Sequence, residues 1–457
     1  MSSLNASLSI ATQSLLAQET ALQVTNNNIA NVSTPGYSRQ AVVLTEAAPT
    51  EVGSVSSGNG VDLVGIQSIR DELVTLRIQQ QTSQQSSADA QVTALTQVQT
   101  LFPTTGSSVA SDLSTFFTSL SALSTSPTDS ATRQTVIASA QNLAGQFNSV
   151  AEGLSSEQSS LDTTVKTDVD QINQLAAQAS TLNNEVAQQN AQGVDAGTLT
   201  DQLNQVELTL SGLTNLSVTH TETGDTLTTG NGTPLVSGGK SFALQTSTGS
   251  DGHVQVLDSS GTNITSSISG GDLGGSIQAR DVSIVSMQSS LDTLASQFAT
   301  AVNTAQESGY DQNGNAGTAL FNVSSSVTGA AASLSMATTD PAAIAASSDA
   351  SSGSNGNVAN LLALQNSTLP AGSSATTLSS NLVYQVGSLT SNATSQSTAI
   401  QLSLTQLTNQ QGAVSGVSID EESANLIRYQ QAYEAAAKVI STISSLFTTT
   451  LNMVSGS

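Results

Sequence analysis

The residues that could carry chemistry in this chain are few. The 457-residue sequence contains no Cys and no Trp, and its two histidines are His220 and His253. A histidine acts as a metal ligand or a general base when further ligands or a partner lie close by. Neither histidine has a Cys or a second His near it in the sequence. We therefore interpret both as sheet or surface residues and expect no catalytic residue, no bound metal and no cofactor.

One short segment resembles part of a phosphate-binding loop. Gly239, Lys240 and Ser241 match the end of that motif. The complete motif also needs a glycine five residues before Gly239, where this chain has Pro234. The sequence predicts a β-turn here instead.

A second segment resembles the start of a calcium-binding loop. Asp311, Asn313 and Asn315 alternate as calcium ligands do, but Gly314 comes too early, and the twelfth position is Asn322 where a glutamate is needed. We interpret this segment as a polar turn.

Three consecutive carboxylates, Asp420, Glu421 and Glu422, follow Ser418. Paired carboxylates can serve acid–base catalysis, but these residues also fit the first turn of a helix. There, negative charge stabilises the positive end of the helix, and Ser418 with Glu421 forms a capping box. We therefore predict that a helix begins here, and we expect no acid–base site.

Apolar residues recur every seventh position at both ends of the chain, which is typical of helices in coiled coils. The amino-terminal ladder lies in a predicted helix over 4–29 and consists of Leu8, Leu15, Leu22 and Ile29. The carboxyl-terminal ladder lies in a predicted helix over 419–454 and consists of Ile419, Leu426, Tyr433, Ile440, Phe447 and Val454. Burying a Leu or Ile side chain is worth roughly 1.5–3 kcal/mol, so neither ladder is stable in water alone. The ladders predict an assembly interface.

Between the two ladders the pattern changes several times. An alternating, glycine-containing stretch over 37–66 predicts a β-arm, and apolar residues at helical spacing predict helices over 71–102, 109–123, 130–153, 161–189, 199–213 and 276–307. Strands are predicted within 216–275, including 242–244 and 254–257, while 308–354 carries no clear pattern. The expected fold is mainly α with a smaller β part, elongated and multidomain. Its domains are a terminal coiled-coil domain with the β-arm (1–68 and 412–457), a mainly helical bundle domain (69–214 and 276–411) and a small inserted β-domain (215–275).

Composition excludes several classes of protein. Nine Lys and Arg against 33 Asp and Glu give a net charge of −24. This charge repels phosphate backbones and anionic lipids, so we expect no nucleic-acid and no membrane partner. The longest apolar runs, such as 342–346, are far shorter than a membrane span. The amino terminus also lacks the basic and apolar segments of a secretory signal peptide.

The chain carries a distinctive motif near each end. The motif positions are Asn27, Asn28, Ile29, Ala30, Asn31, Thr34, Pro35, Gly36, Tyr37 and Arg39 near the amino terminus, and Gly416, Asp420, Glu421, Glu422, Gln430, Ala432 and Tyr433 near the carboxyl terminus. These motifs resemble the signatures of the axial rod, hook and hook-associated proteins of the bacterial flagellum, and the carboxyl-terminal motif resembles the hook-associated protein 1 family in particular. Two internal stretches, 274–281 and 309–314, agree with this family.

The resemblance implies a structural, non-enzymatic subunit of the flagellum at the junction between hook and filament. Its terminal helices would form an inner coiled-coil domain that self-assembles into a ring. The implied partners are further copies of itself, the hook protein, the second junction protein on the filament side, an export chaperone and the type III export apparatus. The implied location is extracellular, after secretion in an unfolded state.

Three alternatives stay open at this stage. A hook or distal-rod subunit would continue from the arm into β-rich domains, whereas 71–213 has a helical pattern here. A cell-wall hydrolase would need a paired carboxylate or an activated nucleophile in a pocket. A coiled-coil surface adhesin would need a cleavable signal and a membrane anchor.

Overall fold

Four of the helices begin after a small polar residue that caps them, and every proline lies outside the α-helices. The side chains of Asp71, Ser108, Asp129 and Ser374 each accept a hydrogen bond from the third backbone N–H of the helix that follows. Such caps satisfy donors that a helix leaves unpaired at its start. The computed structural model describes residues 2–52, 55–193, 195–221 and 224–455. Its α-helices are α1 (Ser2–Ala30), α2 (Glu72–Thr100), α3 (Val109–Thr125), α4 (Ser130–Ala191), α5 (Gly197–Leu213), α6 (Gly271–Gln278), α7 (Val285–Glu307), α8 (Ala330–Ser333), α9 (Gly356–Ala363), α10 (Ala375–Ser415) and α11 (Ile419–Ser455).

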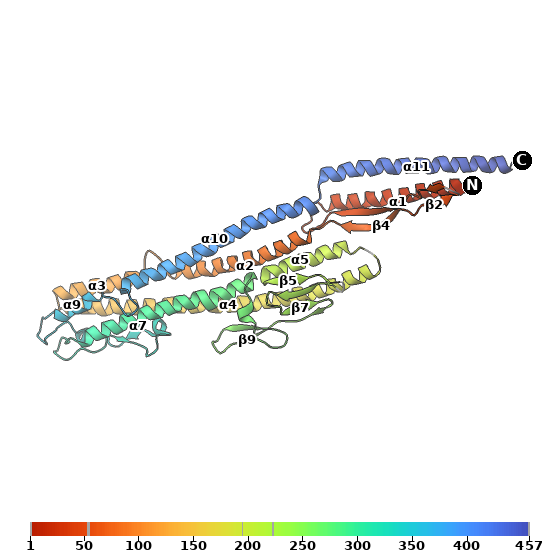
Figure 1. Cartoon of the computed structure of the whole chain (residues 1–457). Coiled ribbons are helices and arrows are strands. Elements are labelled where there is room, and N and C mark those ends of the chain that lie inside the picture. The colour runs from red at the N-terminus through yellow and green to blue at the C-terminus, as the bar shows by residue number, and fades with distance from the viewer. Residues whose placement is uncertain (1, 53–54, 194, 222–223, 456–457) are drawn as a thin grey trace.

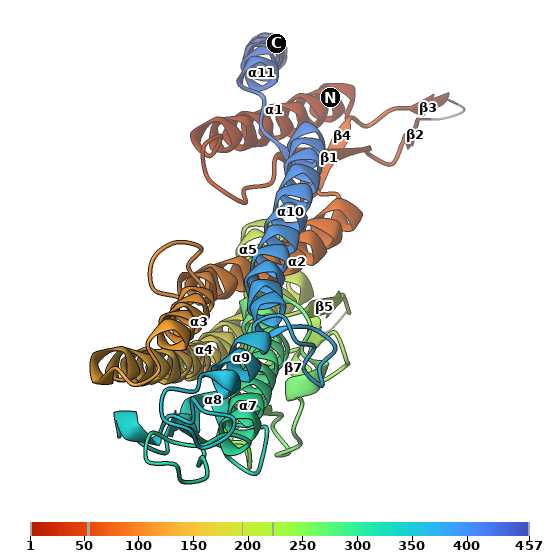
Figure 2. The ribbon, with the colours of Figure 1, turned by 90° about the vertical axis from the view of Figure 1, so that its left-hand side faces the viewer.

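The molecule is elongated and mainly helical, as expected (Figure 1). Helices α2, α3, α4, α7 and α10 run along its length, and α10 lies against α2. The two terminal helices, α1 and α11, pack together at one end, beyond the helical body. Seen end-on, the β-arm projects sideways from α1 (Figure 2). No helix among the described residues is long and apolar enough to cross a membrane.

Helix α4 corrects one prediction, because two helices over 130–153 and 161–189 were expected. The structure has one continuous helix of 62 residues, which is about 93 Å long. Gly153 does not end a helix. A Cβ atom at this position would lie 2.6 Å from Cδ2 of Leu101, so the glycine lets α4 approach the segment that follows α2. Leu154 and Gln158 continue the buried face through the predicted break.

Two apolar cores lie along α4. The first packs α3, α7, α9 and α10 against its first half, around Phe116, Phe117, Phe298 and Phe321, whose neighbouring ring centroids are 5.6–6.5 Å apart. The second packs the second half of α4 against α5, α6 and several β-strands. The unpatterned segment 308–354 folds onto the first core through β11 (Phe321–Asn322), α8, β12 (Ser335–Met336) and a 3₁₀ turn (Pro341–Ala343).

The inserted β part lies between α5 and α6. Strands β5 (Leu216–Thr219), β6 (Thr226–Thr229), β7 (Pro234–Ser237) and β8 (Lys240–Ser241) form an antiparallel sheet in that order, and β9 (Gln245–Thr248) pairs with β10 (Val254–Leu257). The strand predicted over 242–244 is wrong, because the chain crosses there from one sheet to the other. Asn173 of α4 holds the crossing through both the N–H and the C=O of Leu244, at 2.8 and 2.9 Å.

The helix predicted to start at Ser276 begins five residues earlier, at Gly271, and contains a π-helical turn over 279–284. The predicted β-arm of two strands contains four within its described residues. In it, β1 (Gln40–Glu46) pairs with β4 (Val61–Ser68), and β2 (Thr50–Val52) pairs with β3 (Val55–Ser57) beyond them.

Candidate assembly interface

The terminal helices form an antiparallel pair. On α1 the fully buried positions include Ala11, Ala17, Ala21 and Val24. The predicted ladder residues Leu8, Leu15, Leu22 and Ile29 lie half-buried beside them. The face of α1 that carries Ile10 and Gln13 lies against the β-arm, since a Cβ atom at Gly60 would be 3.2–3.5 Å from these side chains.

Helix α11 carries two neighbouring columns of apolar side chains, each column being a row of residues spaced by seven. The column buried in this structure contains Ala436 and Ile443, three residues after Tyr433 and Ile440. The predicted ladder is the neighbouring column: Leu426, Tyr433, Ile440 and Phe447 are half-buried, Ile419 is exposed, and the side chain of Val454 lies outside those described. Sequence periodicity therefore identified the correct helix but not its most buried column.

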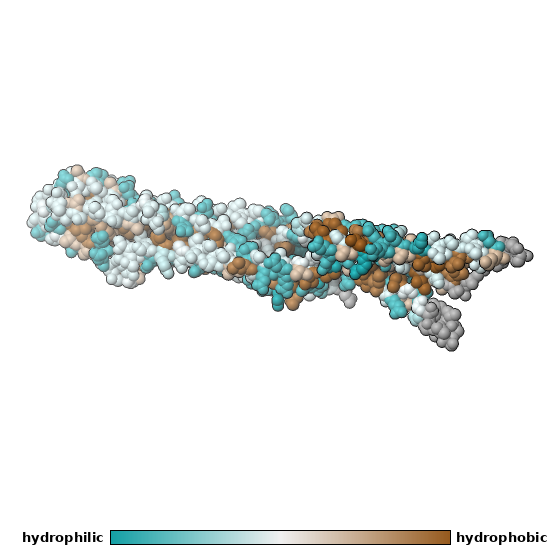
Figure 3. All heavy atoms as spheres, turned by 90° about the horizontal axis from the view of Figure 1, so that it is seen from above, coloured by the Kyte–Doolittle hydropathy of each residue, from teal (hydrophilic) through white to brown (hydrophobic). Residues whose placement is uncertain are grey.

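A further apolar ladder on α11 was missed. Val439, Leu446 and Met453 are spaced by seven residues and are 48, 50 and 73% exposed. We call these three residues the outer ladder. Figure 3, which looks at the molecule from the side of α10 and α11, shows apolar side chains gathered along the terminal helices. A regular ladder left in water is an incomplete helix–helix contact.

The carboxyl-terminal end of α1 and the amino-terminal end of α11 meet at a set of hydrogen bonds around Asn28. Its Oδ1 accepts from the hydroxyl of Tyr37 at 2.8 Å and from the N–H of Gln40 at 2.9 Å. Its Nδ2 donates to the C=O of Gln40 at 2.9 Å and to Oε2 of Glu422 at 3.3 Å. Burial, with the charges of Asp201 and Glu422, raises the pKa of Tyr37 to about 12, so the phenol remains a neutral donor.

Arg39 joins the arm to α11. Its Nε lies 2.9 Å from Oε1 of Glu422 and one Nη lies 2.8 Å from Oε2 of Glu421, while its backbone N–H donates to the C=O of Ser415 at 2.9 Å. The last contact reaches the end of α10. A single arginine therefore connects the arm to both helices at the bend between α10 and α11.

Asp201 of α5 ties the same region to the helical body. Its carboxylate accepts from the N–H and the hydroxyl of Ser38, at 2.9 and 2.7 Å, and from Nε and Nη2 of Arg70, at 3.0 and 2.9 Å. We call Asn28, Tyr37, Arg39, Asp201 and Glu422 the polar junction. It fixes the terminal pair and the arm to α5, so it sets the direction of the terminal pair relative to the body.

The structure thus brings together the signature residues Asn28, Tyr37, Arg39, Glu421 and Glu422, which are far apart in the sequence. Sequence reasoning missed Asp201, Arg70 and Gln40. One usable signal was the position of Arg39 and Arg70 at the two ends of the arm, in a chain with only nine basic residues. Other signature residues are exposed on the turn after α1 or on α11, among them Thr34, Pro35, Gly36, Asp420 and Gln430.

The remaining candidate residues have structural partners. Lys240 and Ser241 form the short strand β8 after a turn. The carboxylate of Asp311 accepts from the backbone N–H groups of Asn313 and Asn315, both at 2.8 Å, as in a polar turn. Within the described parts of the chain, no three or more His, Asp and Glu side chains are grouped so that they could hold a metal ion.

The histidines are both paired with aspartates. Nδ1 of His253 lies 3.0 Å from Oδ2 of Asp162, whose Oδ1 accepts from the buried Arg280 at 2.6 Å. Nδ1 of His220 lies 2.8 Å from Oδ1 of Asp225.

Comparisons with known proteins agree with this geometry at both ends and in the middle. Residues 95–321 match the family model of the flagellar hook-associated protein FlgK helical domain. Residues 8–37 match the flagella basal body rod protein model, and residues 410–453 match the flagellar basal body rod FlgEFG protein C-terminal model.

Relatives cover almost the whole chain. Flagellar hook-associated protein 1 of Escherichia coli (strain K12) is 27% identical over 97% of this chain and 98% of its own length. The protein of that name from Bacillus subtilis (strain 168) is 28% identical over 95% of both chains. The solved structure of the flagellar hook junction protein FlgK from Burkholderia pseudomallei shares the fold, with a TM-score of 0.68 and 18% identity, over 74% of this chain and 100% of that one. The chain therefore belongs to the family of flagellar hook-associated protein 1, a structural component of the bacterial flagellum.

Proposed function

We propose that this protein joins the hook to the filament of the flagellum by assembling with further copies of itself through α1 and α11. The observation that carries this proposal is the outer ladder. The neighbouring column of α11, with Ala436 and Ile443, already packs on α1, so Val439, Leu446 and Met453 need a second helix to cover them. Each large apolar side chain that becomes buried contributes roughly 1.5–3 kcal/mol, so three in register favour association by several kcal/mol.

The polar junction gives this assembly surface a defined direction. Domains made of 1–68 with 412–457, 69–214 with 276–411, and 215–275 would then have separate roles: the first forms the ring and the other two extend from it. The ladder residues named from the sequence, together with the outer ladder, form the contact with neighbouring subunits. Contacts of Arg39 support this division, because this residue of 1–68 pairs with Glu421 and Glu422 and bonds to Ser415, all within 412–457.

The proposed partners are copies of this chain in a ring, the hook protein on one side and the second junction protein on the filament side. An export chaperone and the type III export apparatus would handle the chain before assembly, and its location would be the extracellular hook–filament junction. A net charge of −24 makes neighbouring copies repel one another, so burial of apolar surface has to overcome that repulsion.

The alternatives receive less support. A hook or distal-rod subunit was expected to be β-rich after the arm, but Glu72–Thr100, Val109–Thr125, Ser130–Ala191 and Gly197–Leu213 are helices. An enzyme that used the neighbouring carboxyl groups of Glu207 and Asp225 would need them accessible to substrate, whereas Glu207 is fully buried and Asp225 is 9% exposed. We therefore propose a role without catalysis.

The proposal is tested by Leu446→Asp in a motile strain that carries this chain in place of its own junction protein. Leu446 is half exposed in the free subunit, so the variant should fold with an unchanged melting temperature but should leave hooks without filaments in electron micrographs. Thr442→Asp is the matched control, because it places the same charge at an exposed polar position of α11. Normal filaments on cells with Leu446→Asp would contradict the proposal.

A further inference from the structure

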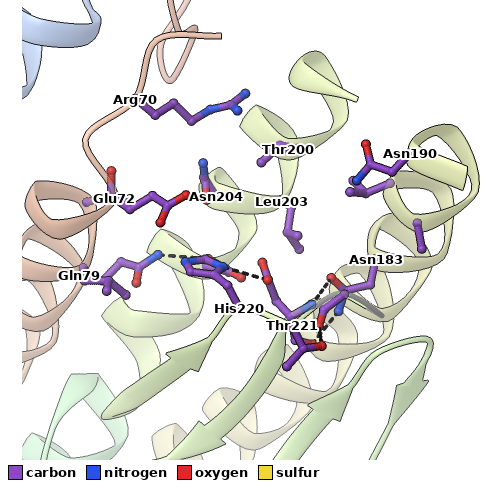
Figure 4. A pocket seen from close by; sticks show the side chains of 17 residues that line it. Arg70, Glu72, Gln79, Asn183, Asn190, Thr200, Leu203, Asn204, His220 and Thr221 are labelled. Carbon is purple, nitrogen blue, oxygen red and sulfur yellow. Dashed lines mark hydrogen bonds and ion pairs between the residues drawn. The ribbon is translucent and has the colours of Figure 1, made fainter. Parts of the chain in front are cut away.

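A polar cavity of about 220 Å³ lies between the start of α2, the end of α4, α5 and the β5–β6 hairpin (Figure 4). The hairpin contributes His220 and Asp225, and α5 contributes Glu207. Glu207 is completely buried and Asp225 is 9% exposed, so two carboxyl groups lie together out of water. Two buried negative charges this close strongly repel each other, and one of them is therefore favoured in its protonated form.

Hydrogen bonds connect these groups to every surrounding element. Oε2 of Glu207 accepts from Nε2 of Gln79 on α2 at 3.1 Å, and the charge of Asp225 acts on the same buried carboxyl group. Oδ1 of Asp225 lies 2.8 Å from Nδ1 of His220. Asn183 of α4 bonds both to the N–H of Asp225, at 2.9 Å, and to its C=O, at 2.8 Å. Asp225 therefore bonds the hairpin to α4, and it faces Glu207 of α5, which bonds in turn to α2.

The charges that face this cluster are Glu72 and Arg70 at the start of α2. Arg70 is already paired with Asp201, while Glu72 adds negative potential at His220. From α4, the residue that bonds to the cluster is Asn183, which is uncharged. Burial and the charge of Asp225 raise the pKa of Glu207 well above its usual range, and the hydrogen bond with Asp225 raises the pKa of His220 to about 9.

At neutral pH these raised pKa values keep Glu207 neutral and His220 protonated. Above about pH 9 Glu207 is a carboxylate and His220 a neutral imidazole. Both raised pKa values mean that the closed hairpin binds more protons than the open one. Closure is therefore complete at low pH and weakens as the pH rises through these values.

We propose that two protons, one on Glu207 and one on His220, fasten the β5–β6 hairpin to α2 and α5, so that alkaline pH releases the hairpin and opens the cavity. The device is independent of the assembly surface, because it lies within the helical body and includes no residue of the terminal pair. It makes the inserted β part a segment whose docking depends on pH.

Hydrogen exchange of the full-length protein tests the proposal. After correction for the intrinsic pH dependence of exchange, the protection of the amides of β5 and β6 should fall about tenfold or more between pH 7 and pH 9. Glu207→Gln should reduce this fall, because an amide mimics the neutral acid toward Gln79 and Asp225. The double variant with Glu207→Gln and His220→Gln should show little change over the same range.

Two further measurements separate this device from general loss of stability. Glu185→Gln makes the same change on an exposed part of α4 and should retain the full pH effect. Because the chain has only two histidines, NMR resolves each ring, and His220 should titrate at about pH 9 in the unmodified protein and lower in Glu207→Gln. Constant protection of β5 and β6 from pH 7 to pH 9, or an equal fall in the double variant, would overturn the proposal.

Discussion

Nε of Arg39 lies 2.9 Å from Oε1 of Glu422, a side chain that is 2% exposed, and this ion pair joins the arm to the first turn of α11. Glu422 was expected only to stabilise the helix end. It does occupy the first turn, but its carboxylate is also the acceptor that connects Arg39 with Asn28. The first prediction concerns this pair.

Arg39→Ala should destabilise the terminal pair by about 1–3 kcal/mol, because Glu422 would keep its buried charge without its main partner. Urea unfolding followed by circular dichroism measures the change. Glu421→Gln is the control: its partner is the same arginine, but Glu421 is 62% exposed, so the change should stay below about 0.5 kcal/mol. A similar effect of both variants would show that burial of Glu422 is not the source of the stability.

The two columns of α11 should separate stability from assembly. Ile443 is 7% exposed, so Ile443→Ala should cost about 2–4 kcal/mol in the stability of the α1–α11 pair. Val439 is 48% exposed, and Val439→Ala should change the free subunit by less than about 1 kcal/mol while weakening assembly. Hydrogen exchange of α11 reports the first effect and sedimentation velocity the second. Equal destabilisation of the free subunit by both variants would argue against an outer ladder.

A buried aspartate predicts a second dependence on pH. Burial, together with the charge of Asp272, raises the pKa of Asp168 on α4 to about 7. The folded state therefore holds a proton that the unfolded state releases near pH 4, so this contribution to stability is lost as the pH rises toward and through 7. Asp168→Asn keeps the neutral form at every pH.

Thermal unfolding of Asp168→Asn should accordingly show a higher melting temperature than the unmodified protein at pH 8, with a smaller difference at pH 5. The control is Asp170→Asn, two residues along α4 on its exposed face, which should show no such pH-dependent difference. A variant that is less stable than the unmodified protein at pH 8 would mean that folding does not raise the pKa of Asp168.

Two glycines within helices should respond in opposite directions to alanine. Nothing lies within 4 Å of a Cβ atom at Gly145 of α4, so Gly145→Ala should stabilise the protein by about 0.5–1 kcal/mol. At Gly275 of α6 a Cβ atom would lie 2.3 Å from the backbone oxygen of Ser87, so Gly275→Ala should destabilise it by about 1–3 kcal/mol. Denaturant midpoints of the two variants test this, and a stabilising Gly275→Ala would show that α2 and α6 can move apart.

Most helices could be predicted because their pattern is local. Positions of Glu72–Thr100, Val109–Thr125 and Ile419–Ser455 follow from caps, apolar spacing and the absence of internal proline. The wrong helix boundaries occur where a residue type that often ends a helix takes part in a tertiary contact inside one instead. Gly153 was interpreted as a helix end, but the helix continues through it and the side chain of Leu101 packs against it, a contact that a local pattern does not contain.

The candidate site shows the same division. Sequence motifs identified Asn28, Tyr37, Arg39 and Glu422 as a signature, but not that they bond to one another or that Asp201 completes the polar junction. Such contacts join residues up to 394 positions apart, and spacing along the chain carries no information about them. The burial of Glu207 against Asp225 is equally a property of the folded chain.

The sequence by itself determined the terminal heptads, the low proportion of charged residues and the family signatures, and so the helical class and the structural role, because these depend on residue type and periodicity alone. Only the tertiary structure decided which column of α11 is buried against α1 and which remains free, and it alone placed Arg39 at the bend between α10 and α11. The physical reason is that helix–helix register and buried ion pairs depend on distances in space, which many sequences of the same periodicity could satisfy differently.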